Sequence, residues 1–111
     1  MVIASRILTL RVRSGTVEIP IKVYAPECEK PRVWRCRYDI GWPEGKHSFA
    51  AYGVDSMQAA VIALGTIGAE IYSSNYHKSG DLWWDAPGNG YGFPVAPSIR
   101  DLLQGDDAKY L

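Results

Sequence analysis

The sequence has few of the residues from which metal sites and disulfide frameworks are built. Among its 111 residues there are two cysteines and two histidines. Cys28 and Cys36 are not spaced as zinc ligands, and a single cysteine pair is not a disulfide framework. His47 and His77 are too few to complete a metal-binding set. We therefore expect neither a bound metal nor a disulfide-based fold.

The chain also lacks an excess of charge and a long apolar run. Lysine and arginine together number 12, as do aspartate and glutamate, so no overall field attracts nucleic acid or an acidic membrane. No uncharged stretch is longer than that of residues 56–69, which is too short to span a bilayer. The opening MVIASRILTLRVRSG has no apolar block or cleavage site typical of a signal peptide. We expect a cytoplasmic protein of bacterial type, with no nucleic-acid or membrane partner.

No arrangement of residues typical of an active site is present. The run GNGYGF is followed by Pro94, whereas a nucleotide-binding fingerprint opens a helix. No G-x-S-x-G motif occurs, and Cys36 falls on the inward face of a predicted strand. Asp81 and Asp85 would lie roughly 13 Å apart along a strand, too far for a glycosidase pair. We name no catalytic residue and no cofactor, and we favour a non-enzymatic protein.

What the sequence does contain is the alternation of apolar and polar residues typical of strands. The predicted strands cover residues 2–12, 17–24, 33–40 and 47–54. The first two flank a turn at Ser14-Gly15, and the last two flank the turn WPEGK. Pro20 has no N–H for a neighbouring strand, which predicts that the second strand lies at a sheet edge. In the fourth strand either Phe49 and Ala51 or Tyr52 and Val54 face inward, and we prefer the first pair. The run APECEKP is predicted to be a loop.

One long helix is predicted over residues 55–77. Asp55 is a suitable N-cap, and Gln58 completes the capping-box pattern. A large apolar stripe is predicted to face the sheet: Met57, Ala60, Val61, Leu64, Gly68, Ile71 and Tyr72.

The opposite helix face carries one charged residue. It is either a plain small-residue face or is covered by the C-terminal segment, a protein partner or a second copy in a homodimer. The interface residues would be Ala59, Ile62, Ala63 and Thr66.

The last third of the chain is rich in glycine and aromatic residues. Residues 81–85 predict a short strand, and residues 97–105 predict a short helix capped by Ser98 and ended by Gly105. We expect residues 1–105 to form a single domain and residues 106–111 to be a loose tail.

The aromatic residues of this region suggest one candidate ligand site. Trp83 and Trp84 must point to opposite faces of a strand, so one of them is left in a groove or on the surface. A cleft could then form from His77, Asp81, Trp84 and Tyr91, together with Arg35 or Arg37. Alternatively, the glycine-rich loop folds back and its aromatic rings close the end of the sheet, which we favour.

Several segments resemble a known family. The stretches IASRILTL, WRCRYDIGWP, FAAYGVDSMQAAVIALGTIGAEIY and DLWWDAPGNGYGFP are similar to small bacterial proteins known as a domain of unknown function. The resemblance covers roughly residues 3–95. It implies that these segments form one unit, and it brings no activity and no catalytic residue.

Together these observations predict an α+β domain. A four- to five-stranded antiparallel sheet would carry one long helix on one face, followed by a short C-terminal helix. For function we favour a non-enzymatic protein-interaction domain, of the partner-binding or immunity type. The alternative is a small-ligand-binding protein or enzyme with a cleft near the glycine-rich loop at residues 81–93.

Overall fold

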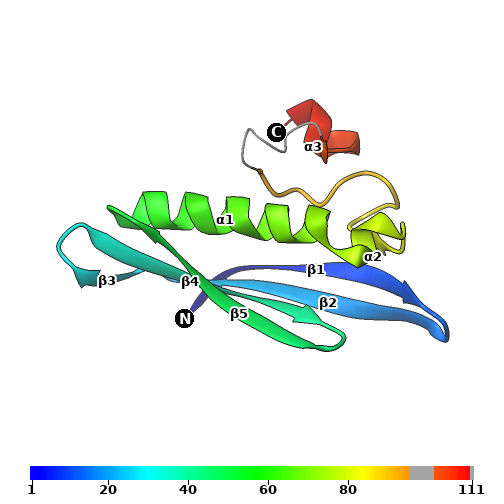
Figure 1. Ribbon diagram of the computed structural model, residues 1–111, viewed down its shortest axis with the longest axis horizontal. Helices are drawn as coiled ribbons and strands as arrows, with labels where there is room; N and C mark the ends of the chain where they lie inside the picture. The colour runs from blue at the N-terminus through cyan, green and yellow to red at the C-terminus, as the bar shows by residue number, and fades with distance from the viewer. Residues whose placement is uncertain (96–101, 111) are drawn as a thin grey trace. The chain divides into compact units, whose positions relative to one another are not determined.

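The computed structural model describes residues 1–95 and 102–110 (Figure 1). The strands are β1 (Val2–Val12), β2 (Gly15–Tyr24), β3 (Glu27–Lys30), β4 (Val33–Trp42), β5 (Gly45–Gly53) and β6 (Leu82–Trp83). The helices are α1 (Ser56–Ser73), α2 (Asn75–Lys78) and α3 (Gly105–Tyr110). The sheet has the order β3-β4-β2-β1-β6, and β5 pairs with β4. The predicted α+β class is confirmed, with six strands in the sheet.

Two compact units make up the chain. The first contains Met1–Arg6 and Pro20–Leu64, and the second contains Ile7–Ile19 and Gly65–Leu111. The boundary between the units falls within β1, β2 and α1, so each of these elements has residues in both units. These are units within what the sequence predicts to be one domain.

In the first unit, β4 is the central strand. It pairs antiparallel with β5 from Trp34↔Gly53 to Trp42↔Gly45, and with β2 through Ile21↔Ile40. The predicted inward face of this strand is confirmed, since Cys36, Tyr38 and Ile40 are buried. The segment predicted as a loop contains β3, which pairs with the first residues of β4.

The side chains of β5 have the predicted inward and outward orientation only in part. Ala51 is buried, as preferred from the sequence, but the side chain of Phe49 is 52% exposed, and Tyr52 is exposed too. Phe49 lies against the ring of Tyr38, with ring centroids 6.2 Å apart.

The prediction that Pro20 places β2 at a sheet edge is wrong, because β2 lies between β4 and β1. The ladder between β2 and β4 includes Ile21 and the residues after it, so Pro20 need not donate a hydrogen bond to β4. Gly41 makes room for the proline ring, because a Cβ at position 41 would lie 2.8 Å from Pro20 Cγ. The connection from β1 to β2 is short, with a turn at Arg13 and Ser14.

Helix α1 begins as predicted and ends earlier than predicted. The Asp55 carboxylate accepts a hydrogen bond from the Gln58 N–H at 2.7 Å, and the Gln58 side chain accepts one from the Val54 N–H at 2.7 Å. The helix stops at Ser73. Ser74 is in an extended conformation and caps α2, because its hydroxyl accepts a hydrogen bond from the His77 N–H. The single rod predicted over residues 55–77 is therefore wrong.

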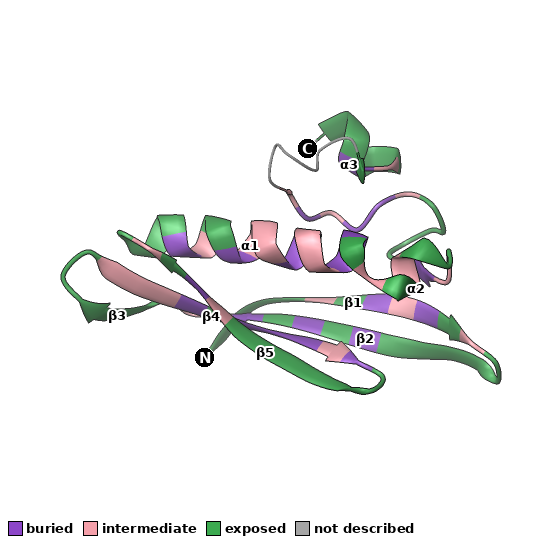
Figure 2. Ribbon diagram, viewed as in Figure 1, coloured by how far each residue is buried: buried purple, intermediate pink, exposed green. Residues whose placement is uncertain are grey.

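The predicted faces of α1 are wrong in the first half of the helix, whereas Gly68, Ile71 and Tyr72 of the predicted inner stripe are buried as expected. Met57 is 75% exposed and Val61 is 60% exposed, whereas Ala59, Ala63 and Ile67 are fully buried (Figure 2). Part of the reason is a close approach in the first unit, where a Cβ on Gly53 would lie 2.5 Å from the Ala59 backbone nitrogen. Small side chains fit this contact, and the larger apolar residues turn outward.

Part of the predicted loose tail is helical. Residues 96–101, which include most of the predicted helix over residues 97–105, lie outside the described part of the chain. Gly105 begins α3 instead of ending a helix, and residues predicted to be a loose tail form this helix with Asp107 buried. Among the described residues, no helix combines the length and apolar character needed to cross a membrane.

Candidate functional sites

The two arginines of the predicted cleft belong to the first unit and already have acidic neighbours. Arg35 forms ion pairs with Glu27 and Glu29, each at 3.4 Å. Arg37 contacts Glu27 at 3.5 Å, and its guanidinium lies 5.0 Å from the centre of the Tyr24 ring. Both arginines therefore have roles on the surface of β4 that need no ligand.

In the second unit, His77 and Tyr91 do meet, but inside the core. The His77 Nδ1 atom lies 2.5 Å from the Tyr91 hydroxyl, and the Tyr91 side chain is 1% exposed. The rings of Tyr72, His77 and Tyr91 pack edge to face, with centroids 4.8–5.5 Å apart. Phe93 is also buried. The burial of Tyr91 and Phe93 agrees with the favoured alternative, in which the loop folds back and its rings are packed inside.

Burial sets the protonation of this aromatic cluster. It lowers the pKa of His77, so the ring is held neutral. Burial and the nearby Asp107 charge raise the pKa of Tyr91 to about 12. Burial and a hydrogen bond to Asp107 raise the pKa of Tyr72 further. The hydroxyls of Tyr72 and Tyr91 are therefore protonated near neutral pH.

The remaining predicted residues of the second unit do not complete one cleft. Asp81 accepts a hydrogen bond from the Ser79 hydroxyl and pairs with Arg11 at 3.6 Å. His77 lines a hollow of about 490 Å³ that does not include Trp84. Trp84, which is 36% exposed, lines another of about 260 Å³ with Asn89 and other loop residues. His77 and Tyr91 are thus in contact with each other, whereas Asp81 and Trp84 have other surroundings.

The second unit contains a buried carboxylate that the sequence did not single out. Asp107 is 2% exposed. Its carboxylate accepts hydrogen bonds from the Tyr72 hydroxyl at 2.6 Å and from the backbone N–H groups of Tyr91 and Gly92, each at 2.7 Å. No local pattern marks this residue, because its partners lie 15 to 35 positions away in the sequence.

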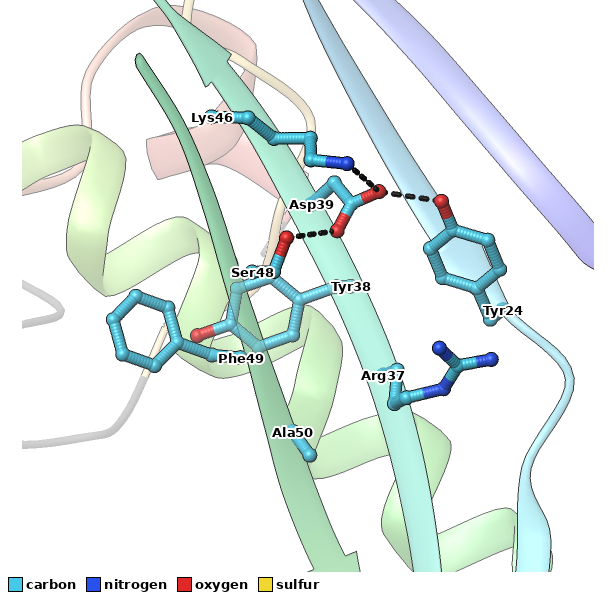
Figure 3. Close-up of a pocket in the computed structure, with 8 residues that line it drawn as sticks. All are labelled: Tyr24, Arg37, Tyr38, Asp39, Lys46, Ser48, Phe49 and Ala50. Atoms are coloured by element: carbon cyan, nitrogen blue, oxygen red, sulfur yellow. Dashed lines mark hydrogen bonds and ion pairs between the residues drawn. The ribbon is translucent and has the colours of Figure 1, made fainter. Parts of the chain in front are cut away.

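A hollow of about 360 Å³ in the first unit contains a second buried carboxylate, that of Asp39 (Figure 3). The Tyr24 hydroxyl donates a short hydrogen bond to this carboxylate, and the Ser48 hydroxyl donates another at 2.7 Å. Lys46 lies 4.0 Å away, and Arg37 also lines the hollow. These side chains come from β2, β4 and β5 and meet on the sheet face opposite Cys36 and Ile40.

The environment of Asp39 keeps it ionised. Burial alone opposes its charge, but hydrogen bonds from Tyr24 and Ser48 and the charges of Lys46 and Lys22 lower its pKa. The hydrogen bond to Asp39 in turn raises the pKa of Tyr24. The rim of the hollow carries the side chains of Lys46, which lies beside Asp39, and of Arg37, which also contacts Glu27. Sequence reasoning missed this site. It could have been found from the strand register, which places Lys22 and Ser48 on either side of Asp39.

The predicted interface on α1 is corrected by burial. Ala59 and Ala63 are fully buried within the chain and are not available to a partner. Thr66 is half-buried, and Ile62 is 42% exposed. The exposed face of the first half of α1 is formed instead by Met57 and Val61, one turn apart, beside Ile62.

The cysteines and acidic residues give no metal centre in residues 1–95 and 102–110, where no group of three metal-ligating side chains comes together. Cys28 is exposed and Cys36 is buried, and both are free thiols.

Comparison with known proteins places the chain in a family. The family model "Domain of unknown function (DUF6968)" matches residues 4–95, so the chain belongs to this family. Searches of curated proteins and of solved structures gave no match.

Proposed function

We propose that this member of the DUF6968 family is a non-enzymatic protein-interaction domain, of the partner-binding or immunity type, acting in a bacterial cytoplasm. The observation that carries the proposal is the exposed apolar face of the first half of α1. Met57 and Val61 present most of their surface to water on this face.

Composition makes this face unusual for a solvent-exposed helix. Residues 56–69 contain no lysine, arginine, aspartate or glutamate, although exposed helix faces are normally rich in these residues. Covering an exposed aliphatic side chain with a partner contributes about 25 cal/mol for each Å² of apolar surface removed from water. A partner with a complementary apolar surface would therefore gain from binding here. The exposed free thiol of Cys28 is compatible with the reducing conditions of the cytoplasm.

The test is a charge placed on the exposed face. We expect Val61→Asp to abolish partner capture by the tagged full-length protein in native lysate, because the new carboxylate would have to be desolvated in the interface. Ser56→Asp is the matched control, since it adds the same charge at an exposed position of the same helix. Light scattering after size exclusion, on the wild type and both variants, identifies a homodimer. A strict monomer that captures the same proteins in all three forms would contradict the proposal.

A second candidate is small-ligand binding, and the hollow around Asp39 favours it over the cleft first expected near residues 81–93. Its volume lies in the range of ligand sites, and its rim carries Arg37 and Lys46. The ligand would be a small organic anion, with its carboxylate on the arginine.

This second candidate is tested by titrating ¹⁵N-labelled protein with benzoate. We expect saturable shifts of the Ser48 and Ala50 amide signals at millimolar concentration. Arg37→Gln should weaken binding at least tenfold, whereas Arg13→Gln, at an exposed arginine of the other unit, should not. Equal loss in both variants would mean that benzoate responds to overall charge and not to this hollow.

A further inference from the structure

The carboxylate of Asp107, in the second unit, is buried and accepts several hydrogen bonds. Three donors converge on it at 2.6–2.7 Å, two of them successive backbone N–H groups of the glycine-rich loop. Hydrogen bonds to an ionised acceptor are roughly twice as strong as neutral ones. The loop therefore has a binding site for a carboxylate, and the site is filled.

The backbone of the loop shapes this site. Gly90 and Gly92 have φ values of +88° and +78°, in the left-handed region that glycine adopts without strain. Such turns direct successive N–H groups to one point and form anion-binding nests. We call the N–H groups of Tyr91 and Gly92, with the Tyr72 hydroxyl, the carboxylate nest. Gly90 leaves room for the ligand, because a Cβ there would lie 2.5 Å from Asp107 Cγ.

The nest favours a carboxylate over a more highly charged phosphate. Two of its donors are neutral backbone groups, and the third is a phenol. Among the described residues, the aspartates that form ion pairs are Asp39 and Asp81, and Asp107 is not one of them. A doubly charged anion would call for a cation such as arginine or lysine.

The occupant, α3, is held mainly by polar contacts, among them a hydrogen bond from the Asp106 N–H to the Asn89 carbonyl oxygen at 3.1 Å, and the buried Leu103 lies just before it. The helix has six residues, too few to be stable as an isolated helix. Asp107 is its only buried residue, and the side chain of Tyr110 is 71% exposed. Besides the nest contacts, Asp106 accepts a hydrogen bond from the Asn89 side chain at 2.9 Å. Polar contacts, rather than an apolar face, attach this helix.

The family model covers the carboxylate nest but not Asp107, the residue that fills it. The three donor residues and Gly90 lie within residues 4–95, which define the family, while Asp107 lies outside that range. The nest is thus part of the family domain, and the group that fills it comes from a segment beyond it.

We propose that the carboxylate nest is a recognition site for an acidic protein segment, that α3 fills it as a tethered internal ligand, and that an aspartate-bearing segment of a partner exchanges with α3. The proposal goes beyond the interaction role of α1, since it concerns other residues and would hold even if Val61 contacted no partner. A tethered ligand competes at an effective concentration of roughly millimolar. A partner segment must therefore bind with additional contacts, or at high local concentration, to displace α3.

The experiment empties the nest in the full-length chain. In Asp107→Asn the carboxylate is lost, and a fluorescently labelled peptide with the sequence of residues 102–110 is titrated while its anisotropy is measured. We expect the peptide to bind this variant at least tenfold more tightly than the wild type, whose nest is already filled. Glu18→Gln is the control, because it removes an exposed carboxylate of the same unit on β2 and should behave as the wild type does.

A control peptide and a titration of the wild type complete the experiment. A peptide carrying asparagine in place of the nest aspartate should not bind the Asp107→Asn protein. If that variant fails to fold, the wild type is titrated to several millimolar with the aspartate peptide, and we expect saturable shifts of the Tyr91 and Gly92 amide signals. Equal binding of both peptides, equal binding by wild type and Asp107→Asn, or no shift in the wild-type titration would overturn the proposal.

Discussion

Gly90 and Gly88 have nearly the same backbone conformation but different surroundings. Their φ values are +88° and +81°. A Cβ at Gly90 would collide with the Asp107 carboxylate, whereas a Cβ at Gly88 would meet nothing within 4 Å. The two positions therefore separate the cost of backbone strain from the cost of disturbing the carboxylate nest.

Alanine at these two glycines gives the first prediction. Gly88→Ala should lower the free energy of unfolding by about 1–2 kcal/mol, the cost of a non-glycine residue in the left-handed region. Gly90→Ala should lower it by about 3 kcal/mol or more, because it also displaces a carboxylate that accepts three hydrogen bonds. Urea unfolding of both variants measures the difference. Equal losses would show that Asp107 contributes little to stability.

At the scale of elements, α1 contains two glycines with opposite roles. Nothing lies within 4 Å of a Cβ built on Gly65. At Gly68 the same atom would collide with the Pro94 carbonyl oxygen and lie 3.0 Å from Val95 Cγ1. Gly68 thus lets the segment after the glycine-rich loop pass directly against the helix.

The second prediction follows from this contrast. Gly65→Ala should raise the free energy of unfolding by about 0.5–1 kcal/mol, since alanine is the better helix former and the site is open. Gly68→Ala should lower it by about 1–3 kcal/mol through overpacking. Thermal unfolding followed by circular dichroism gives both values. Stabilisation by both substitutions would mean that Pro94 and Val95 can move away from position 68 at little energetic cost.

The strands and the start of α1 could be predicted because their signals are local. The alternation around Cys36 and Tyr38 marked an inward face, and Asp55 marked the helix start. The faces of α1 could not be assigned, because residues 56–69 are uncharged throughout and amphipathicity does not distinguish the sides. Choosing the largest apolar residues as the inner stripe failed where close packing requires Ala59 and Ala63.

The candidate sites were less predictable than the strands. Both buried carboxylates, Asp39 and Asp107, are held by residues distant in the sequence. Asp39 could have been found from strand register, once Lys22 and Ser48 are placed beside it. Asp107 could not, since a helix of six residues after a glycine carries no periodic signal.

For the molecule as a whole, the third prediction concerns stability against pH. Burial lowers the pKa of His77 in the folded chain below its ordinary value of 6.5. The unfolded chain therefore binds this proton more readily, and stability that is present above pH 6.5 is lost as the pH falls from there toward the folded pKa. Asp39, whose pKa is lowered from 3.8, adds a loss only at more acidic pH.

Denaturant unfolding between pH 8 and pH 5 measures this dependence. His77→Gln should flatten the fall in stability below pH 6.5, while His47→Gln, at an exposed histidine, should keep the wild-type slope. A wild-type slope in His77→Gln would place the proton uptake elsewhere in the chain.

The fit of the Pro20 ring against Gly41 has a consequence for how relatives of this chain can diverge. Position 41 cannot accept a side chain while Pro20 is kept, because a Cβ there meets the proline ring. Homologous sequences that carry a larger residue at 41 should therefore have lost the proline at 20. Correlated substitution at positions 20 and 41 among homologues would therefore be evidence that β2 and β4 are paired throughout the family.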